Sequence, residues 1–198
     1  MANEHQLKQT RGKLEQSKKY ELLTNDTIEL GGGVTLFRIK ALISFGNVEK
    51  GELGGYVEKE DNLCHSGNAW VTGNARVYSN AKVYGNARVY SNADVSGNAK
   101  VYDNALVSGY AKVTDNARVY SNARVFGDAK VYDNAKVTDN ALVYGNAKVY
   151  GDAWVTDNAW VTGNAKVTGN AEVTSIAWVT GNAKVTGNAK VSGGELLN

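Results

Sequence analysis

The stretch that decides the fold begins at residues 67–72, Gly-Asn-Ala-Trp-Val-Thr, and continues at residues 73–78, Gly-Asn-Ala-Arg-Val-Tyr. Alanine then stands at every sixth position from Ala69 to Ala189, and valine does the same from Val71 to Val191. These 21 hexapeptides keep a single reading frame through residue 192. A fixed short period of this kind is typical of a stacked repeat architecture.

Each hexapeptide predicts a short strand followed by a turn. Ala and Val are separated by one residue, so both side chains lie on the same side of an extended segment. The two residues before Ala are Gly, Ser or Asp and then Asn in most units, and such residues form turns with positive φ. Strand and turn, repeated, wind a parallel β-helix whose narrow interior suits small side chains. The sequence therefore predicts an all-β solenoid.

The pattern Ala-x-Val-x-x-x resembles the hexapeptide repeat of left-handed parallel β-helices, in which three hexapeptides make one triangular coil. The resemblance covers about two thirds of the chain, and it implies about seven coils of 18 residues and a left-handed winding. Residues 37–43 (Phe-Arg-Ile-Lys-Ala-Leu-Ile) and 54–57 (Gly-Gly-Tyr-Val), with Asn-Leu at 62–63, lead into the repeat. This leader is similar to that of YdcK-like bacterial proteins and of related phage-associated hexapeptide-repeat proteins, which are often described as acyltransferases.

Four segments follow from these patterns. Residues 1–19 are predicted as a polar tail or short helix, residues 20–62 as an N-terminal β-rich cap with a first irregular coil, residues 63–192 as the β-helix, and residues 193–198 as a C-terminal tail. A cap is expected because the first coil of a solenoid presents an open strand edge and a bare apolar end. Within the cap, Asn25 and Asp26 separate two apolar segments, which predicts a hairpin turn there.

Composition limits the class of protein. The chain has 198 residues, the size of one domain, and a formal net charge of +2. Its only cysteine, Cys64, rules out an internal disulfide and favours a reducing compartment. No apolar stretch is long enough to span a bilayer, and residues 1–19 lack the apolar core of a signal peptide. We therefore expect a cytoplasmic protein that has no membrane partner.

If three hexapeptides make a coil, residues 18 apart stack on one face, and the residue between Ala and Val points outward. Face one then carries Trp70, Arg88, Leu106, Arg124, Leu142, Trp160 and Trp178. Face two carries Arg76, Asp94, Lys112, Lys130, Lys148, Lys166 and Lys184. Face three carries Lys82, Lys100, Arg118, Lys136, Trp154, Glu172 and Lys190.

Face one gathers apolar side chains. Six of the 21 outward positions are Trp or Leu, and five of these lie on face one. Such a strip predicts an interface for a protein partner or for a homo-oligomer, a dimer or trimer. Two alternatives stay open, namely simple β-preference of aromatic residues and a groove that stacks sugars or bases. The predicted partner-binding residues are Trp70, Tyr90, Leu106, Phe126, Leu142, Tyr144, Trp160, Ile176 and Trp178.

Faces two and three are basic. Lysine on exposed strands discourages edge pairing and keeps a repetitive β-protein soluble, which explains most of these residues. An alternative function is binding of nucleic acid or another anionic polymer. The candidate anion-binding residues of face two are Arg76, Lys112, Lys130, Lys148, Lys166 and Lys184.

Catalytic residues were sought and none is predicted. Acyltransferases with this repeat use a histidine as general base, but His5 and His65 both lie outside the 21 hexapeptides and no loop interrupts the frame. We therefore expect a non-catalytic protein with no cofactor and no metal, and an acyltransferase-like enzyme is the alternative. The leading expectation is a non-catalytic β-solenoid scaffold that binds a protein partner through its aromatic face. The resemblance to phage-associated proteins implies a phage or prophage type, and with it one specific form of this function, the inhibition of a host defence complex such as a CRISPR effector.

Overall fold

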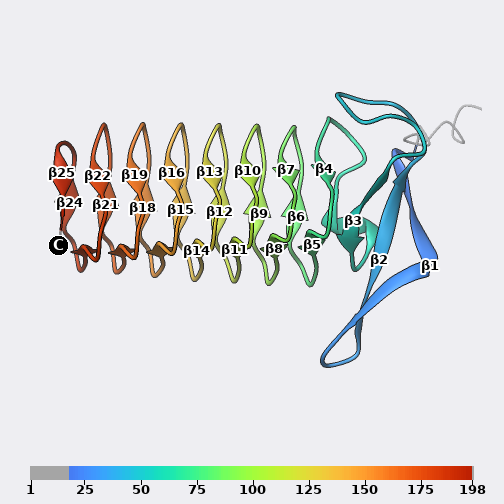
Figure 1. The fold of residues 1–198 in the computed structure, drawn as a ribbon, viewed down its shortest axis with the longest axis horizontal. Coiled ribbons are helices and arrows are strands. Elements are labelled where there is room, and N and C mark those ends of the chain that lie inside the picture. Colours follow the sequence, from blue (N-terminus) through green and yellow to red (C-terminus); the bar gives the residue numbers. More distant parts are fainter. Residues whose placement is uncertain (1–17, 198) are drawn as a thin grey trace, which may run out of the picture.

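The structure is a computed structural model that describes residues 18–197, so the predicted tail lies outside the described residues except for its last two. The described chain is all-β apart from the 3₁₀ helix η1 (Glu60–Asn62). Short parallel strands stack into a straight β-solenoid, with a β-rich cap at one end (Figure 1). The predicted fold class is confirmed, and the left-handed winding stays a prediction.

Each hexapeptide contributes one two-residue strand, and strands 18 residues apart pair in parallel on three faces. Face one consists of β4 (Trp70–Val71), β7 (Arg88–Val89), β10 (Leu106–Val107), β13 (Arg124–Val125), β16 (Leu142–Val143), β19 (Trp160–Val161), β22 (Trp178–Val179) and finally β25 (Glu195–Leu196). Face two contains β5 (Arg76–Val77), β8 (Asp94–Val95), β11 (Lys112–Val113), β14 (Lys130–Val131), β17 (Lys148–Val149), β20 (Lys166–Val167) and β23 (Lys184–Val185). Face three contains β6 (Lys82–Val83), β9 (Lys100–Val101), β12 (Arg118–Val119), β15 (Lys136–Val137), β18 (Trp154–Val155), β21 (Glu172–Val173) and β24 (Lys190–Val191).

The interior is made of the Ala and Val of every unit. From Ala69 to Val185 these side chains are at most 2% exposed. Each coil donates backbone hydrogen bonds to the next, as from the Lys112 N–H to the Ala129 carbonyl at 2.9 Å. Backbone hydrogen bonds between successive coils and a continuous apolar core hold the strands of the prism in place.

Each corner of the prism is formed by two residues, one of which adopts positive φ while the other forms side-chain hydrogen bonds. The first residue of each unit, Gly, Ser or Asp, has φ between 56° and 72° in all 21 units, which short polar residues and glycine accept most readily. The Asn that follows lies in the turn as predicted, and its side chain has a second role. Its side chain donates to the Asn one coil on, as from Asn104 to Asn122 at 3.3 Å, so ladders of amides run along the edges of the prism.

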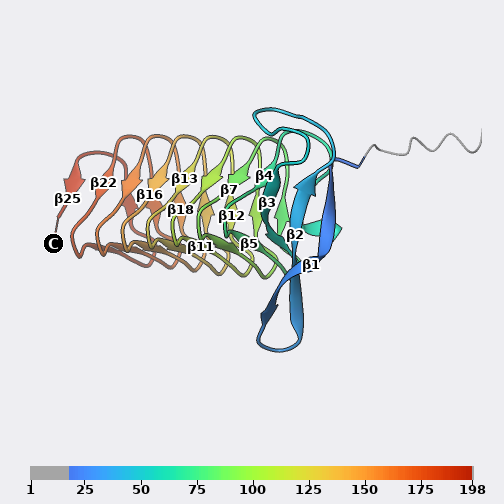
Figure 2. The same cartoon turned by 45° about the vertical axis from the view of Figure 1, so that its right-hand side comes forward.

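The cap differs from the prediction in the position of its hairpin. Strand β1 (Tyr20–Leu30) is continuous and pairs antiparallel with β2 (Val34–Ala41), so the turn lies at residues 31–33. Asn25 and Asp26 lie instead in a bulge of β1. Two glycines with positive φ, Gly32 and Gly33, make the tighter turn. Strand β3 (Leu53–Val57) then pairs antiparallel with β2 and parallel with β5, so the cap extends the sheet of face two (Figure 2).

The cap is anchored by Lys19 and Tyr20, which moves its boundary into the predicted tail. Lys19 is 1% exposed, and its Nζ donates to the Ala69 carbonyl at 2.7 Å. Burial lowers the pKa of this amine to about 8. The Tyr20 hydroxyl donates to the Leu63 carbonyl at 2.8 Å, and its ring stacks on His65 at 4.4 Å between centroids. His65 is thus packed against the cap, and Leu63, two residues earlier, forms a parallel bridge with Val83.

The predicted C-terminal tail contains a further strand. β25 pairs in parallel with β22, with Glu195 opposite Trp178 and Leu196 opposite Val179. Glu195 follows its partner Trp178 by 17 residues, one fewer than the 18 of a full coil (195 − 178 = 17). The 18-residue period alone therefore does not assign Glu195 to face one. Face one therefore continues for one strand beyond the last hexapeptide.

Candidate functional site

We define the face-one strip as the outward residues of β4, β7, β10, β13, β16, β19, β22 and β25, which include Trp160 and Trp178, two of the exposed large apolar side chains. Consecutive members pair in parallel register, as Leu142 does with Trp160. Neighbours along the strip are therefore separated by one strand spacing, about 4.8 Å. The sequence-based assignment of the first seven members to one sheet is confirmed.

The strip is most exposed around β19 and β22. Trp160 and Trp178 are 40% and 39% exposed, and their rings meet edge to face at 5.5 Å between centroids. Ile176, which takes the place of a corner Asn beside them, is 73% exposed. The three side chains border an almost purely apolar hollow of about 360 Å³. Large apolar side chains exposed together in this way are typical of a surface that another protein covers.

The middle of the strip mixes apolar and cationic groups. Leu106 and Leu142 are half-buried between their neighbours. The rings of Phe126 and Tyr144 stack at 4.8 Å, and the Arg124 guanidinium lies 5.7 Å from the Phe126 centroid. Stacking at the strand spacing fixes the rotamers of these rings, so little side-chain entropy remains to be lost on binding.

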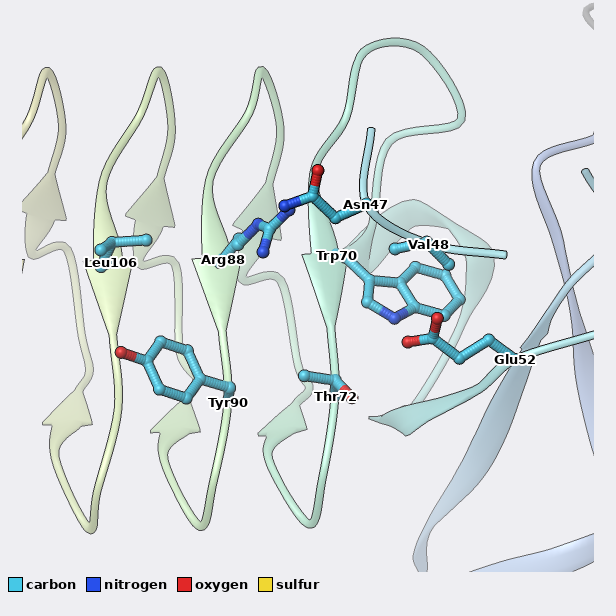
Figure 3. Close-up of a pocket in the computed structure, with 8 residues that line it drawn as sticks. All are labelled: Asn47, Val48, Glu52, Trp70, Thr72, Arg88, Tyr90 and Leu106. Atoms are coloured by element: carbon cyan, nitrogen blue, oxygen red, sulfur yellow. The ribbon is translucent and has the colours of Figure 1, made fainter. Parts of the chain in front are cut away.

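Trp70, by contrast, is not available to a partner, and its prediction as an exposed member of the strip is wrong. It is 3% exposed and packs edge-on against Phe45 at 5.3 Å between centroids. Val48 and Glu52 of the loop between β2 and β3 lie over its indole (Figure 3). The loop covers Trp70 because it closes the end of the first coil, which would otherwise be open to solvent. The signal for it lies in the non-repeating residues 42–52 and not in the period.

A hollow of about 330 Å³ remains between this loop and the strip. Arg88, Tyr90 and Leu106 border it on the solenoid side, and Arg88 points toward Asn47 (Figure 3). The hollow ends the accessible part of the strip, which therefore begins at Arg88.

The predicted column of cationic residues lies on the sheet of face two, and its first member, Arg76, is engaged by a neighbouring carboxylate. Arg76 donates two hydrogen bonds to Asp94, at 2.6 and 2.8 Å, and these bonds raise the pKa of the guanidinium. Asp94 is 6% exposed, so the pair is internal to the face and Arg76 is not an open anion site. Because the two residues are 18 apart, the face assignment alone could have indicated this pairing.

The other five lysines of the column stack in register, as Lys112 does with Lys130 and Lys148 with Lys166. No ion pair engages them among residues 18–197. A groove of about 540 Å³ runs beside four of them, from Lys112 to Lys166, with Tyr110 at one end. Sequence reasoning missed Tyr110, which is 63% exposed. The available signal was that it replaces a corner Asn, as Ile176 does.

His65 and Cys64 lie at the cap end of the solenoid, outside the repeat. The His65 Nδ1 accepts the Lys19 backbone N–H at 3.2 Å, and burial lowers the pKa of this imidazole. The Cys64 Sγ lies 3.0 Å from the Ser66 hydroxyl. Across residues 18–197, no group of three or more His, Cys, Asp or Glu side chains is placed to hold a metal ion.

No protein-family model matches the chain, and no curated protein matches it either. The described part of the chain contains no helix with the length and apolar character needed to cross a membrane.

Proposed function

We propose that this protein is a non-catalytic β-solenoid that binds protein, either a partner or its own copies, through the face-one strip. The observation that carries the proposal is the continuous column from Arg88 to Trp178 on one rigid sheet, with its widest apolar exposure at Trp160 and Trp178. Trp, Tyr and Arg are the residues that dominate the binding energy of protein interfaces. A flat, long surface also suits a protein partner better than a small ligand.

The geometry of the strip supports tight binding with little reorganisation. Coil-to-coil hydrogen bonds hold every strand, and stacked or edge-to-face rings hold the side chains. A preorganised surface loses less conformational entropy on association than a mobile one.

The test uses a matched control that the chain itself provides. Trp160→Glu/Trp178→Glu should abolish association, because two carboxylates would be buried in an apolar contact. Trp154→Glu should leave it unchanged, since Trp154 is equally exposed at 40% but lies on face three. The measurement is the absolute mass in solution by light scattering, together with capture of partners from the native host. An unchanged mass and unchanged partner binding in the double variant would reject the proposal.

The nature of the partner is supported only by the resemblance of the leader to that of phage-associated proteins. On that basis we propose a host defence complex, such as a CRISPR effector, as the protein class to test. In an inhibition assay, the wild type and Trp154→Glu should inhibit and the double variant should not.

A second candidate function is favoured by the stacked lysines of face two. Five ammonium groups in one column, four of them beside a groove, form a local positive strip although the net charge of the chain is only +2. A single-stranded oligonucleotide is the probe. Its affinity should fall steeply with salt, by a slope of roughly −0.7 per phosphate neutralised. Lys130→Glu/Lys148→Glu should reduce that slope, and an affinity insensitive to salt would remove this candidate.

A further inference from the structure

The residues on the two sides of Leu142 along the face-one strip are complementary in charge and polarity, which the hexapeptide period alone does not require. Leu142 stands at the centre of the accessible part. On the cap side follow Arg124, Leu106 and Arg88, and on the other side follow Trp160, Trp178 and Glu195. Each step is one strand spacing, and the coils stack in a straight row (Figure 1). Residues the same number of strands away from Leu142 on the two sides therefore lie at equal distances from it.

We propose that the occupant of the strip is a second copy of this chain, packed face to face and antiparallel, with the two-fold axis through Leu142. The inference rests on the proposed function and names its partner. The axis runs along the strand direction, so each residue meets the one equally far from Leu142 on the other side. Leu142 meets itself, Leu106 meets Trp178, Arg124 meets Trp160, and Arg88 meets Glu195.

Every one of these encounters is favourable. An arginine over a tryptophan face is a cation–π contact, and the leucine–tryptophan and leucine–leucine pairs bury apolar surface. Arg88 and Glu195 form no ion pair within residues 18–197 and are open to each other across the axis. Because the interface is isologous, each unlike pair occurs twice.

The second outward position of each strand fits the same axis. Tyr144 meets itself, Phe126 faces Thr162, and Tyr90 faces Leu197, and none of these encounters opposes two charges. The cap loop covers Trp70, one coil beyond Arg88, and its Asn47 borders the Arg88 end of the paired positions.

Three other arrangements match less well. Parallel packing of two copies would place Arg88, Arg124 and Glu195 each against its own copy, which opposes like charges three times. An antiparallel axis through Arg124 opposes the two arginines. An axis through Trp160 is the nearest competitor, because it would pair Arg124 with Glu195, but it engages only five positions of the strip where the Leu142 axis engages seven.

The arrangement has a consequence for any other partner of the strip. A dimer of this kind covers Trp160 and Trp178 on both copies, so another protein binds there only by displacing the second copy. Self-association and partner binding then compete, and the concentration of the protein sets the balance between them.

A charge-swap series tests the pairing. The wild type should show twice the 21.2 kDa of one chain by light scattering and sedimentation. Arg88→Glu and Glu195→Arg should each raise the dimer dissociation constant at least about tenfold, because each opposes like charges at both pairs. The double variant Arg88→Glu/Glu195→Arg should restore the wild-type constant. A wild type that stays monomeric, or a double variant no better than the singles, would overturn the inference.

Cysteine cross-linking tests the axis itself. In a Cys64→Ser background, a short bis-maleimide reagent should link Leu142→Cys into a dimer, since Leu142 meets its own copy across sheets that lie about 10 Å apart, too far for a direct disulfide. Efficient cross-linking of Trp160→Cys without cross-linking of Leu142→Cys would overturn this axis. The proposed function fails separately: if the swap has no effect but Trp160→Glu/Trp178→Glu still removes association, the strip binds protein and only the second-copy assignment falls.

Discussion

Val131→Asp should abolish cooperative folding of the solenoid, whereas Lys130→Asp, one residue earlier, should leave its stability unchanged or slightly increase it. Val131 is fully buried in the prism. Within the described chain its surroundings are the Ala and Val side chains of the core, which offer a carboxylate no partner. Burial of an uncompensated charge is expected to lower the free energy of unfolding by more than ~3 kcal/mol.

The control variant, Lys130→Asp, introduces the same side chain but is not expected to lower the free energy of unfolding. Lys130 is exposed on face two and pairs in register with Lys112 and Lys148. An aspartate there would lie between two cations and relieve their repulsion. Urea unfolding followed by circular dichroism measures both variants. Equal midpoints for the two would contradict the inward and outward assignment on which the account depends.

The fold was largely predictable because one period controls it. The alternation of Ala and Val specifies which side chains are buried, and the 18-residue coil specifies which outward residues share a sheet. The pairing of Arg76 with Asp94 was within reach of the same reasoning, since both stand in one column. The hairpin of the cap was misplaced because Asn and Asp tolerate a bulge as readily as a turn.

The candidate site was less predictable, because its limits are set by segments outside the repeat. The loop that covers Trp70 comes from the non-repeating residues 42–52, and no periodic signal indicates where it folds back. At the other end, Glu195 joins the strip after a coil one residue short of 18. The proposed antiparallel pairing depends on both facts, so it could be stated only from the structure.

Deletion of residues 145–150 is the second change with a large expected effect. This hexapeptide, Gly-Asn-Ala-Lys-Val-Tyr, follows Leu142 on the chain. Its removal keeps Ala and Val in their inward positions, so the prism should fold with near-wild-type stability. All later outward residues move to the neighbouring face, however, and Trp160 and Trp178 leave the sheet of Leu106 and Leu142.

The matched control is deletion of residues 181–186, Gly-Asn-Ala-Lys-Val-Thr, which follow Trp178. It removes a unit of nearly the same composition but leaves the strip from Arg88 to Trp178 on one face. This variant should still associate, with the dimer weakened only by displacement of Glu195.

The most direct test of the central claim is therefore the light-scattering mass of these two deletion variants beside the wild type, with circular dichroism to establish folding. The account predicts two folded proteins, of which the 181–186 deletion still associates and the 145–150 deletion is monomeric and binds no partner. A folded 145–150 deletion that associates as the wild type does would show that the aligned strip is not the interaction surface.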